Sequence, residues 1–118
     1  MANVLVIDDD TDLAEMVTMM LNRAGMQVES IAAAETIIET IGRFRPDIIL
    51  MDIYLGDQDG RDISRSLKTS ETFGSIPIIL YSAGHITALS VQESLADDFI
   101  AKPFGMEQMV SKIRSFIS

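Results

Sequence analysis

Three aspartates follow short apolar runs in this chain, a placement that can build a site for a cation. Asp8 and Asp9 come directly after "NVLVI" (3–7), and Asp52 comes directly after "DIILM" (47–51). Two unit charges about 4 Å apart repel each other by about 4 kcal/mol at an effective dielectric near 20. Carboxylates that gather at one place must therefore take up a proton or hold a cation. Because all the ligands on offer are oxygens, Mg²⁺ is the expected ion, and it would keep several of its waters.

A carboxylate in such a pocket can also attack phosphorus and form an aspartyl phosphate, which makes Asp52 a candidate nucleophile. Two other apolar runs end on groups that suit this chemistry. Ser82 closes "PIILYS" and can donate a hydrogen bond, and Lys102 closes "DFIAK" and can bring an ammonium group to phosphoryl oxygens. Because phosphoryl transfer depends mainly on positioning and charge neutralisation, these side chains together indicate phosphoryl capture at Asp52.

Five apolar runs rich in valine and isoleucine predict the strands that position these side chains. Runs of this kind, continuous and not alternating, are typical of strands buried on both faces of a parallel sheet. Segments with helical spacing lie between them, and the stretch 82–97, which has no consistent apolar face, predicts a short or irregular fourth helix. The predicted strands are 3–7, 27–31, 47–51, 77–81 and 98–101.

This alternation predicts an α/β fold with a doubly wound, five-stranded parallel sheet, because parallel strands need right-handed crossovers. In the strand order 2-1-3-4-5, strands one and three flank the point where the order reverses, at the edge where ligands bind. The three carboxylates would therefore share one pocket.

The expected helices have recognisable apolar stripes and ends. The first has either Thr11 or Asp12 as its cap and Gly25 at its end, while one of the acids 8–10 is also expected to cap a helix. Its core stripe is Leu13, Met16, Val17, Met20, Leu21 and Ala24, and that of the second helix is Ile37, Ile38 and Ile41.

Composition narrows the function further. The 118 residues suit a single domain, 1–118, and the net charge of −9 disfavours direct binding to nucleic acid or to anionic membranes. The chain has no cysteine, which excludes disulfides and thiolate chemistry, and its N-terminal apolar run is too short for a signal peptide or a membrane span. We therefore expect a cytoplasmic protein that binds a cation or a basic partner.

Four segments, taken in order, resemble the receiver domain of response regulators, the CheY-like phosphoacceptor of two-component signalling. The segments are "VLVIDDD", "IILMDIYLGDQDG", "IPIILYSA" and "FIAKPF". The resemblance covers essentially the whole chain and implies a flavodoxin-like three-layer sandwich. It also implies a signalling phosphoacceptor with at most weak self-phosphorylation and autodephosphorylation, not a turnover enzyme.

The resemblance assigns roles to individual residues. Asp52 would take a phosphoryl group from a sensor histidine kinase or a phosphotransfer protein. Asp9, Asp52 and the backbone carbonyl of Tyr54 would bind Mg²⁺ directly, with Asp8 acting mostly through water. Lys102 would pair with the phosphoryl group and would form a cis peptide bond with Pro103.

The switch is implied by the resemblance as well. Ser82 would move towards the phosphoryl group while Phe99 rotates inward. The face made by the fourth helix, fifth strand and fifth helix would then change its affinity for an unknown downstream protein, or would form a phosphorylation-linked homodimer. Phe99 lacks the hydroxyl of the tyrosine that is common in the family, so it would act by packing alone. Gly56 stands where the family usually has a proline.

Two other functions remain open. A degenerate receiver would bind partners without phosphorylation, although the acidic residues, Ser82 and Lys102 are all present. An aspartyl-nucleophile phosphohydrolase would generally place a second aspartate two positions after the first, where this chain has Tyr54. His85 is expected to be a loop residue, and Asp57 and Asp59 to be turn residues.

Overall fold

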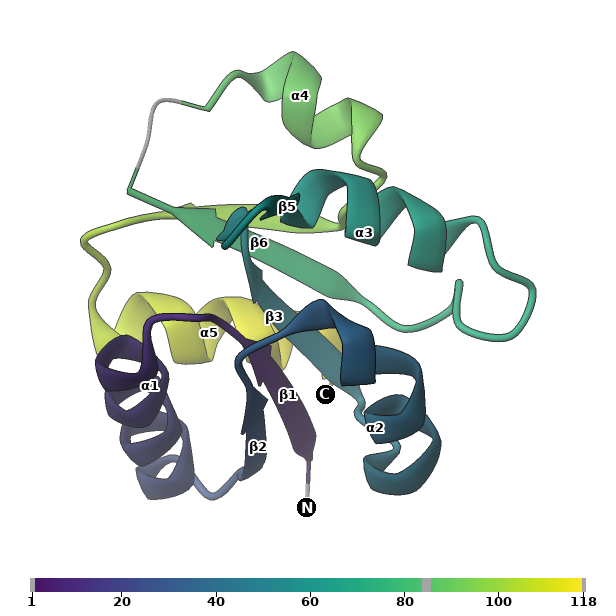
Figure 1. The fold of residues 1–118 in the computed structure, drawn as a ribbon. Coiled ribbons are helices and arrows are strands. Elements are labelled where there is room, and N and C mark those ends of the chain that lie inside the picture. The colour runs from purple at the N-terminus through teal and green to yellow at the C-terminus, as the bar shows by residue number, and fades with distance from the viewer. Residues whose placement is uncertain (1, 84–85, 118) are drawn as a thin grey trace.

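The computed structural model describes residues 2–83 and 86–117, and strands alternate with helices along most of the chain (Figure 1). The elements in chain order are β1 (Asn3–Ile7), α1 (Thr11–Arg23), β2 (Gln27–Ile31), η1 (Ala34–Thr36), α2 (Ile37–Phe44), β3 (Ile48–Asp52), β4 (Tyr54–Leu55), β5 (Gln58–Asp59), α3 (Gly60–Lys68), β6 (Ile78–Ser82), α4 (Ala88–Glu93), β7 (Asp98–Ala101) and α5 (Met106–Ile117). His85 lies outside the described residues.

The main sheet has five parallel strands in the order β2-β1-β3-β6-β7. This is the predicted order 2-1-3-4-5, because the short strands β4 and β5 form a separate two-stranded sheet. Within the described residues, no helix is long and apolar enough to cross a membrane. The strand order confirms the doubly wound architecture, and the ends of β1 and β3 lie side by side at the carboxyl edge of the sheet.

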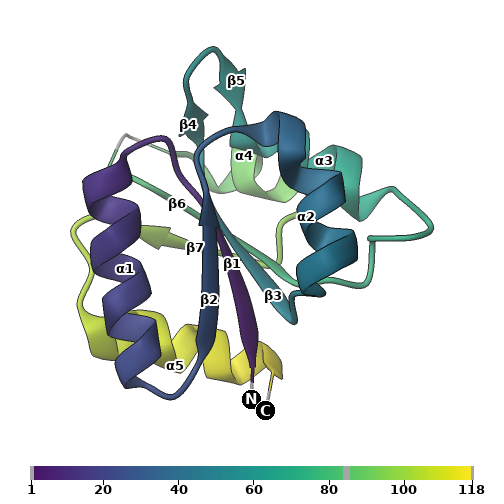
Figure 2. The same ribbon diagram turned by 60° about the horizontal axis from the view of Figure 1, so that its bottom comes forward.

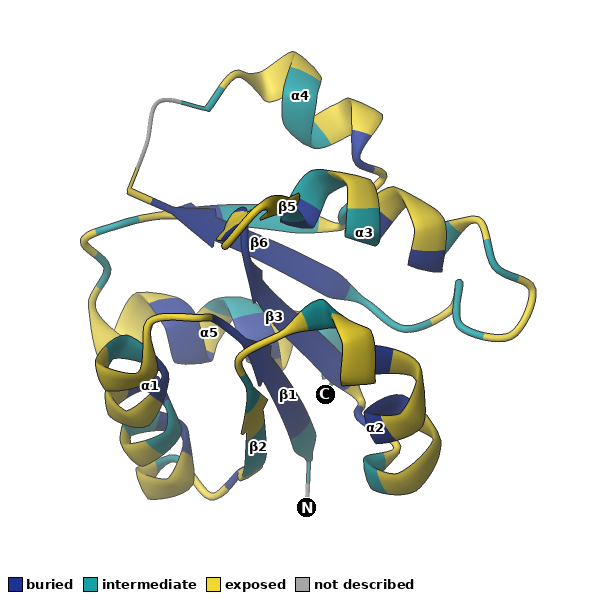
Figure 3. Cartoon of the chain, viewed as in Figure 1, coloured by how far each residue is buried: buried dark blue, intermediate teal, exposed yellow. Residues whose placement is uncertain are grey.

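Helices cover both faces of the sheet, α1 and α5 on one side and α2, α3 and α4 on the other (Figure 2). Alternate residues of each central strand enter one of two apolar clusters: Val4 and Val6 belong to the cluster under α1 and α5, whereas Leu5 and Ile7 belong to the other. The central strands β3 and β6 are buried throughout, and β1 is buried from Val4 to Ile7 (Figure 3). Successive side chains thus point to opposite faces, which fixes where each strand-end residue must point.

The prediction that all five strands are buried on both faces is wrong for the two edge strands. Gln27 and Ser30 on β2 and Ala101 on β7 are exposed. An edge strand has a neighbour on one side only, and the helices do not cover it fully. The apolar run predicted the strand correctly but not its place at the edge.

Details of the first two helices also differ from expectation. The N-cap of α1 is Asp10, whose carboxylate accepts a hydrogen bond from the backbone of Leu13 at 3.1 Å, so the predicted caps Thr11 and Asp12 are wrong. Met16 and Ile38, predicted to face the core, are 46% and 51% exposed. Both lie at the margin of their stripes, beside the buried residues Val17 and Ile37.

Helix α4 is short, as predicted, and none of its six residues is buried. It is held to α3 by hydrogen bonds: the Ser64 hydroxyl donates to the carbonyl of Ser94 at 2.9 Å, and the Arg65 guanidinium donates to the carbonyl of Glu93 at 2.8 Å. The chain then turns at Leu95, which has a φ of 62° and is 43% exposed.

Leu95 gives a direct test of this turn. The left-handed conformation costs a residue with a Cβ about 1–2 kcal/mol, a cost that glycine does not have. Glycine offsets part of this advantage, because it loses more conformational freedom on folding. We expect Leu95→Gly to raise the free energy of unfolding by about 0.5–1 kcal/mol in urea denaturation. The control Leu95→Ala keeps the Cβ and should show no gain; equal stability of the two variants would contradict the assignment.

Candidate active site

Asp8 and Asp52 lie opposite each other on the same face of the sheet. The register pairs Val6 with Leu50 and Ile7 with Met51, so the next residue of each strand is an aspartate. Both carboxylates follow the alternation that sends Val6 and Leu50 towards α1 and α5. The register of β1 and β3 therefore places Asp8 and Asp52 next to each other on one face of the sheet.

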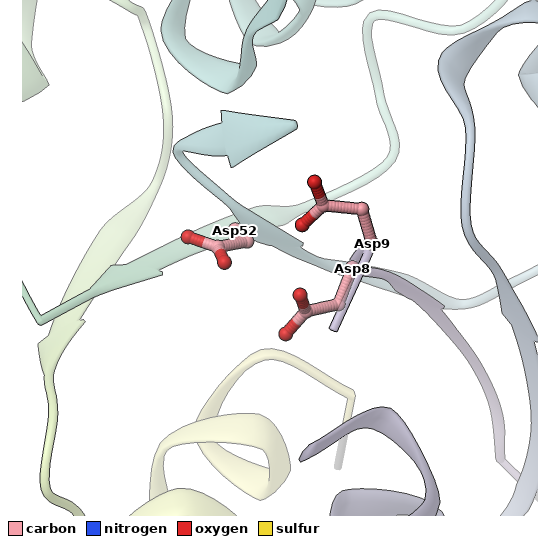
Figure 4. Close-up of side chains that lie close together, drawn as sticks. All are labelled: Asp8, Asp9 and Asp52. Carbon is pink, nitrogen blue, oxygen red and sulfur yellow. The ribbon is translucent and has the colours of Figure 1, made fainter. Parts of the chain in front are cut away.

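Asp9 completes a cluster of three acids, as Figure 4 shows. One carboxylate oxygen of each of Asp8, Asp9 and Asp52 lies within 4.8 Å of the other two. Asp8 and Asp52 are buried, whereas Asp9 is exposed. The predicted convergence of these residues is thus observed.

Burial raises the pKa of the Asp8 carboxyl above its ordinary value, and the negative charge of Asp52 adds to this rise. Three groups oppose it. Hydrogen bonds from the Tyr81 hydroxyl and from the backbone N–H of Asp10 lower the pKa, as does the positive charge of Lys102. The charged form of Asp8 is therefore favoured by groups that the protein itself provides.

A β-hairpin that the sequence did not predict lies above the acids. Its turn is the pair Gly56 and Asp57, and Gly56 has a φ of 61°, as the first central residue of a type II′ turn requires. The backbone N–H of Gly56 donates to Asp9 at 2.9 Å, and that of Tyr54 donates to Asp52 at 3.2 Å. The hairpin thus fixes two of the three carboxylates.

Asp57 lies in the turn of the hairpin, as predicted, but the same prediction is wrong for Asp59, which lies in β5. It is the N-cap of α3, accepts a hydrogen bond from the backbone N–H of Arg61 at 2.8 Å, and forms an ion pair with the Arg61 guanidinium at 2.7 Å. These contacts pair the carboxylate of Asp59 outside the acid cluster.

Lys102 approaches the acids from the end of β7. Its Nζ lies 3.3 Å from a carboxylate oxygen of Asp52, and its backbone N–H donates to the carbonyl of Ser82 at 2.9 Å. The Lys102–Pro103 peptide bond is cis, as the resemblance implies. Ser82, buried at the end of β6, thus lies on the strand between Asp52 and Lys102.

Tyr81 is the site residue that sequence reasoning missed. Its side chain is buried, and its hydroxyl donates to Asp8 at 2.6 Å. The Nζ of Lys102 lies 4.9 Å from the centre of its ring. A sequence signal existed: a tyrosine inside the aliphatic run "PIILYS" must find a partner for its hydroxyl once it is buried.

Gly60 allows the hairpin and α3 to pack directly against the backbone of Asp52. A Cβ at this position would lie 2.3 Å from the carbonyl oxygen of Asp52 and 3.1 Å from the Cα of Ile53. The backbone N–H of Gly60 donates to the carbonyl of Ile53 at 2.6 Å. This close approach needs a glycine for steric reasons.

The donor set suits Mg²⁺. It offers carboxylate oxygens within 4.8 Å of one another and, among the described residues, no cysteine or histidine ligand to favour a softer metal. Asp8 and Asp52 are buried and Asp9 is exposed, so the ion could keep waters on its solvent side.

Comparisons with known proteins show the family. Residues 4–114 match the response regulator receiver domain. The chain is 34% identical to the DNA-binding response regulator MtrA of Mycolicibacterium paratuberculosis over 114 residues, which is 95% of this chain and 49% of that protein. It is 33% identical to the probable transcriptional regulatory protein TcrX of Mycobacterium tuberculosis, over 97% of this chain and 49% of that protein. The chain belongs to the receiver domain family of two-component response regulators.

Solved structures agree in fold. A putative response regulator from Chloroflexus aurantiacus superposes with a TM-score of 0.91 at 29% identity, covering 98% of this chain and 97% of that one. The chemotaxis protein CheY4 of Vibrio cholerae superposes with a TM-score of 0.89 at 24% identity, covering 98% of each chain, which supports the flavodoxin-like fold. The chain spans about half the length of the curated relatives it matches.

Gly60 provides a test of how the site is built. Because a Cβ would overlap the Asp52 carbonyl, we expect Gly60→Ala to lower the free energy of unfolding by about 2–3 kcal/mol in urea denaturation. Gly42, exposed on α2 with nothing within 4 Å of an added Cβ, is the matched control. Gly42→Ala should raise the free energy of unfolding by about 0.5–1 kcal/mol. Equal effects of the two substitutions would contradict the steric argument.

Proposed function

We propose that this chain is the phosphoacceptor of a two-component system and that Asp52 is the residue that receives the phosphoryl group. A carboxylate oxygen of Asp52 would form the new bond to phosphorus while the bond to a histidine nitrogen of the kinase or phosphotransfer protein breaks. The histidine nitrogen keeps that electron pair. The observation that supports this most is the buried Asp52, with Lys102 at 3.3 Å and the oxygens of two further aspartates within 4.8 Å.

Each neighbour of Asp52 has a distinct part in the proposal. Asp9, Asp52 and the carbonyl of Tyr54 would hold Mg²⁺, with Asp8 acting mostly through water, and the ion would neutralise charge on the phosphoryl oxygens. Lys102 would exchange its contact with Asp52 for a contact with the phosphoryl group. The hydroxyl of Ser82 would move towards that group.

The proposed output is the face formed by α4, β7 and α5. Phe99 on β7 is half-buried against the apolar cluster that contains Leu67 of α3, so inward rotation would alter the packing beside this face. On its other side, Asp98 forms an ion pair with Lys112 of α5 at 3.0 Å. We propose that this face binds the downstream protein or a second copy of the chain. The single domain 1–118 and the cytoplasmic location are parts of the same proposal and rest on the sequence.

The proposal predicts that acetyl phosphate with Mg²⁺ labels the wild-type protein and that Asp52→Asn abolishes the label, because the amide is a poor nucleophile. Intact-mass spectrometry measures the label. Asp57→Asn is the matched control, since Asp57 is an exposed acid in the hairpin turn, and it should label like the wild type.

Other outcomes point to the alternative functions. Undiminished labelling of Asp52→Asn would exclude Asp52 as the acceptor. A wild-type protein that takes up no label from acetyl phosphate or from a kinase would favour a degenerate receiver. Release of many phosphate equivalents per chain from a small phosphate ester would favour a phosphohydrolase, although Tyr54 stands where such an enzyme needs its second aspartate.

A further inference from the structure

Tyr81 lies next to Asp52 in the sheet, yet its hydroxyl reaches Asp8 on the strand beyond. The register pairs Tyr81 with Asp52, and Asp8 lies on the far side of Asp52. Asp8, Asp52 and Tyr81 all continue the positions that face α1 and α5, so they form one row across three adjacent strands. Only a long side chain could cross the middle strand of this row, because adjacent strands lie about 4.8 Å apart.

Both carboxylate oxygens of Asp8 have a donor from the protein. The Tyr81 hydroxyl donates to Oδ2 at 2.6 Å, and the backbone N–H of Asp10 donates to Oδ1 at 2.9 Å. Asp8 is 1% exposed, so solvent can hardly replace a lost donor. Asp9, by contrast, is exposed and accepts from the hairpin backbone at Gly56.

We propose that the Tyr81 hydroxyl is a built-in competitor of Mg²⁺ at this site: it satisfies Asp8 in the ion-free protein and thereby weakens the binding of the ion. This inference rests on the proposed metal site. A buried carboxylate that already accepts two hydrogen bonds gains less from a nearby cation, or from the waters that the cation carries, than one that lacks a donor. Tyr81 is thus a positioning residue that sets the affinity of the site without touching phosphate.

The ring of Tyr81 packs against two neighbouring side chains, and these contacts do not involve its hydroxyl. Lys102 lies over the ring, and Phe104 packs edge-on against it with the ring centres 6.0 Å apart. Phenylalanine keeps both contacts and removes only the hydroxyl. Tyr81→Phe therefore isolates the donor to Asp8.

We expect Tyr81→Phe to bind Mg²⁺ about tenfold more tightly than the wild type in isothermal titration calorimetry, which corresponds to about 1.4 kcal/mol. Thermal denaturation should give a consistent result, because tighter binding stabilises the folded protein more. Without the ion, Tyr81→Phe should be less stable than the wild type, and saturating Mg²⁺ should remove most of that difference. A side chain that served only for packing would lower stability equally with and without the ion.

Three further variants complete the design: one core control, Asp8→Asn, and Asp8→Asn combined with Tyr81→Phe. Ile113→Val truncates a buried residue of the same apolar cluster and should lose stability without changing the affinity for Mg²⁺. In an Asp8→Asn background, adding Tyr81→Phe should leave the affinity unchanged within about twofold, because the charge on which the hydroxyl acts is gone.

The outcomes separate this inference from the function on which it rests. Wild-type protein that binds Mg²⁺, with Tyr81→Phe binding equally or more weakly, would overturn the inference alone. An undiminished gain in the Asp8→Asn background would also overturn it, since the effect would not pass through Asp8. Absence of any Mg²⁺ binding by the wild type would overturn both this inference and the proposed metal site.

Discussion

Repulsion among carboxylates at one edge of the sheet is the constraint on which the rest of the structure depends. Three acids converge because parallel strands end at the same edge, and each needs compensation of its own. Asp52 faces an ammonium group, Asp9 accepts a hydrogen bond from the hairpin, and Asp8 accepts one from a tyrosine. These compensating groups come from the residue after β7, from the β4–β5 hairpin and from β6, so the arrangement of the three carboxylates depends on all these elements.

The compensation is directional, and the proposed transfer of a phosphoryl group to Asp52 would depend on this direction. Hydrogen bonds and one ion pair set the orientation of each carboxylate before any ligand arrives, and the proposed ligands would have to displace the contacts from Lys102 and Tyr81. The close packing of Gly60 against the backbone of Asp52 fixes the main chain of that aspartate. A site assembled from flexible surface acids would lack this order.

The sequence was informative where the cause is local or periodic. Continuous apolar runs located the strands, and their alternation with helices predicted a doubly wound parallel sheet. The ends of these strands then placed Asp8, Asp9, Asp52 and Lys102 at one edge. Exposure of Met16 and the edge position of β2 could not be read in the same way, because they depend on how far neighbouring elements extend. Sequence patterns describe a segment, whereas exposure belongs to the assembled fold.

Tyr81 shows the limit most clearly, because its hydrogen bond to Asp8 joins residues 73 positions apart and crosses a third strand. Knowing that a buried tyrosine needs a partner does not identify the partner. That step requires the register of three strands at once, together with the face to which each side chain points. The hairpin above the acids is similar, since each of its strands has only two residues and gives no periodic signal.

Helix α4 has a consequence for the motions of the molecule. Since none of its residues is buried and hydrogen bonds from Ser64 and Arg65 attach its C-terminal end to α3, displacing it would expose little apolar surface. The free energy needed to open this segment should therefore lie well below that of global unfolding. Amide hydrogens of α4 would exchange with solvent deuterium while those of β1, β3 and β6 stay protected. A small change in free energy would therefore be enough to displace this helix.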